Sequence, residues 1–498
     1  MKKFSTKAWQ FVIAAVFLTL VLTPAWAQQD DSSSAQAGGA PPAATGPSAG
    51  PDIENPPLSG LDQPSSEPAY GGRSYLIPGI QLSEAVNATS SGLISNIAGV
   101  NEVARGLGSL DLQKIWKKYQ LGLDYIGGGT VYQGHITQAN QGRSYQTHTL
   151  AMDQRILWRT GQFVVRDSFN YLPEGSFGFG SYGGAGGFGS ALGGGGIGGS
   201  GAGTGLGGGT TGGIPGGTFG GGTIGSVGIQ PRINNLSIVD VTESLSPRST
   251  VVLAAGYDYT DFLKSGQTSL PLLNSQMSSA QIGYDYLLNR RDRISALYAY
   301  QSFHFPTSGS GNVNAHLWHL LYGHRISGRL NVVVGGGPQL IIFHSSLASV
   351  PNRLTASGRA EVSYQMSSRT SARVSYMHYT SPGSGFFAGA NTDVVNTSLD
   401  HLVGRYWKFD VNGGYSYNSR LQQSVLGASA AKNYRYWYGG GSLRRQLGRY
   451  FGAFASYQYN DIRFNTSVCT VPGTCGASTG RHVGLVGIDW HPHPFRLD

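Results

Sequence analysis

Eleven charged residues occupy positions from which they could act together on one surface. Each lies on the polar side of a stretch in which apolar and polar residues alternate: Asp153, Arg155, Arg166, Asp258, Asp285, Arg359, Glu361, Arg373, Asp400, Asp410 and Asp489. Successive side chains of an extended strand point to opposite faces, so residues of one parity share a face. Acids and bases on a shared wet surface can interact with polar solutes. They can also pair with one another and stiffen a sealed interior.

Other residue types offer weaker chemistry. On a strand, His316 and His324 share one face and His319 takes the other, so these three cannot converge on a metal ion. His491 and His493 are two ligands alone, which make a weak site. The sequence also shows no G-x-S-x-G elbow on a strand-to-helix turn, the context in which such a serine acts as a nucleophile. We therefore expect no metal site, no cofactor and no enzymatic activity.

The N-terminal segment 1–27 has the three parts of a secretory signal peptide. Lys2 and Lys3 precede an apolar run that ends before Pro24, and Ala25-Trp26-Ala27 forms a small-x-small cleavage site. An uncleaved anchor helix is the weaker alternative, because the apolar run is too short. We expect cleavage after Ala27 and export of the mature chain.

The chain has only two cysteines, Cys469 and Cys475, and export would place both outside the cytosol. Outside the cytosol, two cysteines this close in sequence tend to be oxidised. The sequence therefore predicts a disulfide that closes one short loop.

Composition excludes several classes of protein. Of 498 residues only 12% are charged, against about 25% in an average soluble domain, while glycine (76) and tyrosine (27) are abundant. The net charge of +9 falls to about +6 without the signal segment, and the bases gather at turns, so nucleic acid is not an expected partner. After residue 23 no apolar stretch reaches the roughly 20 residues of a membrane helix. An all-β protein with a weakly charged exterior, suited to lipid, remains.

Four regions follow the signal segment. Residues 28–74 are rich in Pro, Ser, Ala and Gly and predict a disordered linker. In 75–118 apolar residues return at irregular spacing, which we interpret as a short helical segment, either a periplasmic extension or a plug. From 119 to 498 the sequence alternates as a β-barrel would, with the block 173–230, 29 of whose 58 residues are glycine, as one long loop. That block contains no lysine, so it is no phosphate-binding loop.

The spacing of turns sets the expected number of strands. Tight basic turns recur about every 40 residues between Arg159 and Arg449 once the block 173–230 is set aside. Each interval holds two strands of more than ten residues and one long loop, whereas a propeller blade would need four short strands and a soluble sandwich has shorter ones. The sequence predicts an antiparallel up-and-down barrel of about sixteen strands.

Tyrosines recur in pairs near the far end of strands that rise from a short turn. The four Tyr-x-Tyr pairs are Tyr257 and Tyr259, Tyr298 and Tyr300, Tyr415 and Tyr417, and Tyr457 and Tyr459. Amphipathic rings prefer the level of lipid headgroups. We interpret these pairs as the outer aromatic girdle of a membrane barrel.

From residue 119 to about 492 the chain resembles the bacterial outer-membrane β-barrels, and among them the sixteen-stranded porins. The likeness rests on architecture and on the alternation of Val486, Ile488 and Trp490 in the last strand, although the chain continues to Asp498. It implies a Gram-negative outer membrane, with the N-terminal extension in the periplasm. The partners it implies are membrane lipid, lipopolysaccharide, the barrel assembly machinery and further copies of the chain.

The resemblance favours a channel through which small hydrophilic solutes diffuse passively, with the eleven charged residues lining the pore. The alternative is a barrel that anchors surface loops for adhesion or for polysaccharide secretion. The glycine-rich block is then a surface-active or gating loop, whereas for a channel it can be a plain disordered insertion.

Overall fold

In the computed structural model the chain divides into two units, Met1–Pro47 and Ser48–Asp498. Only the second contains residues whose placement is described: 58, 74–90, 99–134, 144–172, 232–263, 273–306, 311–344, 351–383, 386–404, 406–422, 431–471 and 474–497. The predicted signal peptide, nearly all of the predicted linker and the glycine-rich block lie outside these residues. Within them, no helix has the length and apolar character needed to cross a membrane.

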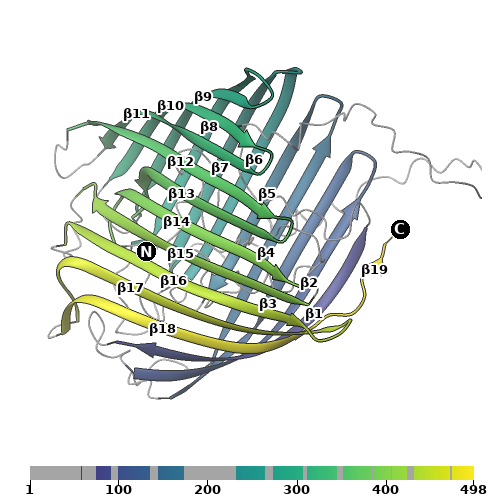
Figure 1. Ribbon diagram of the computed structural model, residues 1–498. Coiled ribbons are helices and arrows are strands. Elements are labelled where there is room, and N and C mark those ends of the chain that lie inside the picture. The colour runs from purple at the N-terminus through teal and green to yellow at the C-terminus, as the bar shows by residue number, and fades with distance from the viewer. Residues whose placement is uncertain are drawn as a thin grey trace, which may run out of the picture. The chain divides into compact units, whose positions relative to one another are not determined.

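The described residues form one sheet of antiparallel strands (Figure 1). The strands are β1 (Tyr75–Thr89), β2 (Gly99–Ile115), β3 (Tyr119–Gly134), β4 (Ser144–Leu157), β5 (Gly161–Leu172), β6 (Arg232–Ser246), β7 (Ser249–Phe262), β8 (Ser275–Leu287), β9 (Asp292–His304), β10 (Asn312–Ser327), β11 (Leu330–His344), β12 (Arg353–Ser367), β13 (Thr370–Ser381), β14 (Ala390–Val403), β15 (Trp407–Arg420), β16 (Asn433–Gln446), β17 (Phe451–Val471), β18 (Thr474–Trp490) and β19 (Phe495–Arg496).

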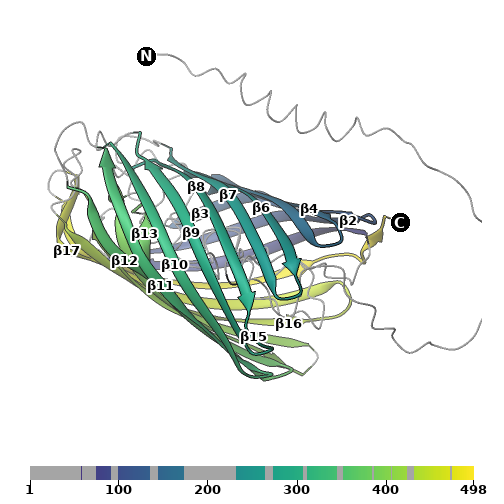
Figure 2. The same ribbon diagram turned by 90° about the horizontal axis from the view of Figure 1, so that it is seen from above.

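The sheet closes on itself into a barrel. From β1 to β18 each strand pairs with the next in sequence, and β1 pairs with β18 from Ile80 opposite Trp490 to Thr89 opposite Arg481. Figure 2 shows the same strands from above, tilted around the barrel. The two-residue β19 extends this closing seam, because Phe495 pairs with Leu76. The expected all-β antiparallel barrel is confirmed.

The predicted count of about sixteen strands is wrong, because eighteen long strands precede β19. The expected helical segment 75–118 is also not observed in the part of it that the structure describes, where the residues form β1 and β2. Inward Ala85, Val103 and Leu107 pack in an apolar cluster with Ile126 and Leu485. Apolar side chains therefore occupy both faces of this hairpin, and the alternation that identified the later strands is lost here.

Short turns connect the strands at one end of the barrel, and three of these turns contain the same hydrogen bond. The Ser246, Ser327 and Ser367 hydroxyls each accept a hydrogen bond of 3.2 Å from the backbone N–H two residues later, which belongs to an arginine each time. Such a serine turn fixes a two-residue reversal. It also places a basic side chain at the end of the barrel that holds Ser74 and Leu497.

The two faces of the wall have opposite character. Large apolar side chains of one parity are exposed, such as Leu320 (58%) and Ile488 (50%), while their neighbours of the other parity are mostly buried. Since an exposed apolar band around a closed barrel suits hydrocarbon, the exposed parity faces lipid and the other faces the lumen.

The glycine-rich block begins and ends on a strand pair that is complete without it. Leu172 at the end of β5 lies opposite Arg232 at the start of β6, and the register continues to Gly161 opposite Glu243. We expect deletion of residues 175–228 to leave the barrel folded, with the heat-dependent gel mobility of the full chain. A deleted chain that migrates as unfolded without heating would contradict this strand pairing.

Candidate functional site: the inner wall of the barrel

The structure places all eleven predicted charged residues on the inward face. Register links them across neighbouring strands: Asp153 lies opposite Arg166, and Asp400 opposite Asp410. Around the seam the parity stays consistent, because Asp489 lies opposite Gln81 on β1. The inward placement thus agrees with the sequence, while the role of these residues in a pore remains a prediction.

Many of the inward charges lie near the short-turn ends of their strands and together form what we term the charged belt. Its members are Asp111, Asp124, Asp153, Arg155, Arg166, Asp240, Asp285, Glu361, Arg373, Asp400, Lys408, Asp410, Arg444 and Asp489. Asp258 and Arg359 lie further toward the long loops. Both signs of charge recur around the wall.

On β4 and β5 the belt is a compact ionic group. Arg166 Nε lies 3.2 Å from Asp153 Oδ2, and Arg155 Nη2 lies 4.0 Å from the same oxygen. Asp240 on β6 faces the same group, and its charge interacts with Arg166. Two carboxylates and two guanidinium groups therefore share one patch of the inner wall.

A second group spans β12 to β16. Arg373 Nη2 lies 2.8 Å from Glu361 Oε1, and Lys408 Nζ lies 4.0 Å from Asp400 Oδ1. Asp410 faces Asp400 across the strand pair and accepts a 2.7 Å hydrogen bond from Ser442. These pairs are half-buried and retain contact with the lumen.

The seam holds the most enclosed pair of the belt. Arg444 Nη2 on β16 donates to Asp489 Oδ2 on β18 at 2.8 Å, and the Asp489 side chain has no exposed surface. Asp489 was predicted from parity. Arg444 was not, although it stands at an inward even position of β16 and could have been found by the same rule.

Sequence reasoning also missed Asp111 and Asp124. These acids lie directly opposite each other on β2 and β3. Asp111 lies within the segment expected to precede the barrel, where no strand was predicted. Asp124 lies in the first predicted strand, and its inward orientation could have been predicted from the alternation of polar and apolar residues there.

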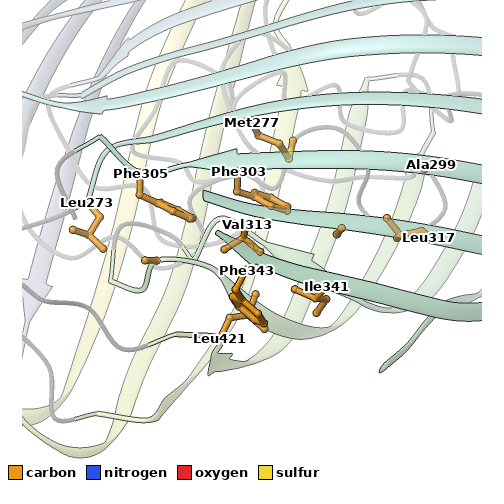
Figure 3. Packing of buried hydrophobic residues seen from close by; sticks show 12 residues of the cluster. Leu273, Met277, Ala299, Phe303, Phe305, Val313, Leu317, Ile341, Phe343 and Leu421 are labelled. Atoms are coloured by element: carbon orange, nitrogen blue, oxygen red, sulfur yellow. The ribbon is translucent and has the colours of Figure 1, made fainter. Parts of the chain in front are cut away.

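Apolar clusters line part of the long-loop half of the wall, beside buried polar side chains such as Gln301, Asn418 and Asn460. Figure 3 shows Met277, Phe303, Val313 and Ile341 of β8 to β11 packed with residues from loops. The loop residues in this cluster are Leu273, Phe305, Ala388 and Leu421. A second cluster on β13 to β17 includes Tyr379, Tyr434, Tyr436, Ile462 and the loop residue Phe387. Loops therefore fold inward against this half of the wall and narrow the lumen there.

Two glycines allow the loop between β13 and β14 to fold inward against the wall. Gly383 and Gly389 adopt φ values of 84° and 83°, which favour glycine. Gly383 O accepts the backbone N–H of Phe387 at 3.2 Å, and the Phe387 ring centroid lies 5.4 Å from that of Tyr434. This contact was not predicted. Two adjacent phenylalanines in a loop of Gly, Pro and Ser were the available signal.

Replacing Phe387 by alanine should loosen this constriction, because its fully buried ring packs on Tyr434 and its loss leaves the partly buried Phe386 ring as the loop's other contact with Tyr434. We expect single-channel conductance to rise by less than twofold while the barrel stays folded. Phe387→Tyr, which keeps the ring, is the control and should leave conductance unchanged. Equal conductance of Phe387→Ala and the unaltered chain would show that the loop does not limit flow.

The eight predicted girdle tyrosines all lie on the outward face, and histidines of neighbouring strands join several outward tyrosines. The Tyr298 hydroxyl lies 2.9 Å from His316 Nδ1, and the Tyr457 hydroxyl 2.8 Å from His482 Nδ1. His319 differs, because it faces the lumen and its Nε2 lies 2.5 Å from Ser357 Oγ. The faces of His316 and His319 are therefore opposite, as predicted.

One outward patch on β5 and β6 is polar. Asp167 accepts hydrogen bonds from Asn235 Nδ2 at 3.2 Å and from Ser237 Oγ at 2.5 Å. All three side chains face away from the lumen, next to the apolar Val165 and Val239 positions. A carboxylate on the lipid-facing side of a barrel is costly unless it is shielded.

No protein-family model matches this chain, and no curated protein matches it. Solved structures with a similar strand arrangement include OpdQ of Pseudomonas aeruginosa, at 10% identity over 85% of this chain and 98% of that chain, with a TM-score of 0.39. OpdK of the same organism, in a structure with vanillate, is 11% identical over 84% and 99%, with a TM-score of 0.41. OccK9 (OpdG) of that organism is 9% identical over 84% and 98%, with a TM-score of 0.41.

Proposed function

We propose that this protein is an outer-membrane channel through which small hydrophilic solutes diffuse passively. The observation that carries the proposal is the charged belt, in which acids and bases face the lumen of a closed barrel with a lipid-compatible exterior. A sheet of this many strands encloses more space than its own side chains fill. Mixed charge on a wet wall favours polar solutes and excludes apolar ones.

The inward-folded loops restrict the size of these solutes. Phe387 and Leu421 reach the wall from separate loops and pack on it with no exposed surface or almost none. Flow would therefore pass the part of the lumen that these loops narrow and then the charged belt. This arrangement supports small solutes rather than folded proteins or long polymers.

Paired neutral variants test whether the belt contacts the permeating solute. Glu361→Gln and Arg373→Gln each remove one charge from the same 2.8 Å ion pair. In a salt gradient across a planar bilayer, Glu361→Gln should shift the reversal potential toward anion selectivity and Arg373→Gln toward cation selectivity. Identical reversal potentials in both variants would contradict a permeation path along the belt and would favour the surface-anchor alternative.

We further propose that the chain is exported with cleavage after Ala27, and that its short turns face the periplasm. Basic turns such as those at Arg248 and Arg329 then lie beside lipid headgroups. Sequencing of the mature N-terminus should start at Gln28; retention of Met1 or Lys2 would contradict cleavage.

The predicted disulfide is supported by register, since Cys469 on β17 lies opposite Cys475 on β18. We expect the purified mature chain to be about 2 Da lighter than its fully reduced form and not to react with iodoacetamide until it is reduced. Alkylation of both thiols without a reductant would show that the pair is not bridged. Because the bridge closes a hairpin tip, its loss should leave the barrel folded.

The outward polar patch supports association with further copies of the chain. Asp167, Asn235 and Ser237 would be shielded from hydrocarbon by a neighbouring barrel. Cross-linking in native membranes should give oligomers whose yield falls in Asp167→Leu. If Asp167→Leu gave the same yield of oligomers as the unaltered chain, the polar patch would not be a contact between subunits.

A further inference from the structure

Leu58, which precedes β1 in the sequence, lies inside the barrel. Leu58 is 2% exposed and packs with Leu321 of β10 and Val333 of β11, both of which face the lumen. These strands stand across the barrel from β1, because the strands follow one another around the ring in sequence order. Leu58 and Ser74, which directly precedes β1, therefore mark opposite walls of the lumen.

Polar contacts hold the Leu58 backbone on both sides. Its N–H donates to Asp285 Oδ1 at 2.7 Å, and its carbonyl oxygen accepts from Arg359 Nη2 at 3.2 Å. Both side chains are buried, and they come from β8 and β12, on either side of the apolar contact. Charge-assisted hydrogen bonds to both ends of one residue fix its position and direction.

The wall is also shaped for this side chain. A Cβ added at Gly323 would lie 2.8 Å from Arg293 Nε and 3.1 Å from Leu58 Cδ2, so a larger residue at 323 would crowd both the arginine and the leucine. The wall thus supplies an acid, a base, two apolar side chains and a glycine around one peptide unit. These are the features of a binding site for a residue with an apolar side chain.

We propose that this part of the wall is a binding site for a peptide unit, and that Leu58 of the same chain occupies it as an internal latch that obstructs the pore. The effect on flow rests on the proposed channel function, whereas the docking itself does not. Asp285, which is a member of the charged belt, holds Leu58 near that belt. Release of the latch would widen the lumen and expose Asp285 and Arg359 to solute.

The docking is tested by engineered disulfides in a Cys469→Ser, Cys475→Ser background. Leu58→Cys with Leu321→Cys should give a cross-linked peptide on mild oxidation of the folded barrel. Leu58→Cys with Leu320→Cys is the matched control, since Leu320 is adjacent in sequence but faces lipid, and it should give none. A cross-link to position 320 and not to 321 would overturn the docking, as would no cross-link to either.

The effect on flow is tested by conductance of the full-length chain in planar bilayers. Oxidised Leu58→Cys, Leu321→Cys protein should conduct at least twofold less than after reduction, and Leu58→Asp should conduct more than Leu58→Met. Equal conductance before and after reduction would overturn the latch while leaving the channel intact. Formation of the disulfide with no conductance in any variant would instead overturn the channel and the obstruction, and would retain the docking site.

Discussion

Replacing Asp489 by alanine should destabilise the barrel by about 3–5 kcal/mol, the cost of leaving a buried charge without its partner. Its carboxylate is fully buried and lies 2.8 Å from Arg444 Nη2. It also stands at the closing seam, where β18 meets β1. Urea unfolding in detergent micelles, followed by tryptophan fluorescence, measures the change in the free energy of unfolding.

Asp400→Ala is the matched control for this prediction. Asp400 is also an inward acid, but its nearest base, Lys408, is 4.0 Å away and both side chains are about one-third exposed. Exposed ion pairs contribute about 0–1 kcal/mol. Equal losses for Asp489→Ala and Asp400→Ala would mean that the seam pair is as well hydrated as the rest of the belt.

The second large effect concerns the lipid face. Leu320 lies midway along β10 with 58% of its surface exposed, so Leu320→Arg would place a charge near the centre of the bilayer. The expected cost is about 2–4 kcal/mol, measured as the change in unfolding free energy in lipid vesicles. The same charge placed on the lumen face should cost far less.

Asn412→Arg supplies that comparison, because Asn412 faces the lumen opposite Ser398 and is only half-buried. We expect it to fold with nearly unchanged stability and to shift the channel toward anions. If Leu320→Arg were tolerated and Asn412→Arg prevented folding, the assignment of inner and outer faces would be reversed.

Much of the wall could be predicted because side-chain parity is a local property. A strand that alternates reveals its two faces, which is why Asp153, Arg373 and Asp489 were placed inward correctly. The first hairpin escaped because polar and apolar residues mix on both of its faces. Val103 and Leu107 lie on the inner face beside Arg105, and Glu84 and Glu102 lie on the outer one, which obscures the alternation. The predicted count of sixteen strands was therefore too low by two, β1 and β2.

Contacts between distant segments could not be predicted in the same way. Whether Asp489 meets Arg444 or another base depends on the stagger of strands, which the sequence does not specify. The inward folding of Phe387 and the docking of Leu58 against Leu321 depend on tertiary packing alone. A residue in a Pro-rich and Ser-rich stretch carries no periodic signal that it will occupy a lumen.

We propose that polar solutes cross the membrane through this lumen, and conductance of the purified, folded full-length chain in a planar bilayer tests this most directly. We predict stable, stepwise increases in ion current that grow in size with salt concentration, and that Leu58→Asp enlarges. A folded barrel that inserts into the bilayer and gives no steps, with or without the Leu58 change, would contradict the account.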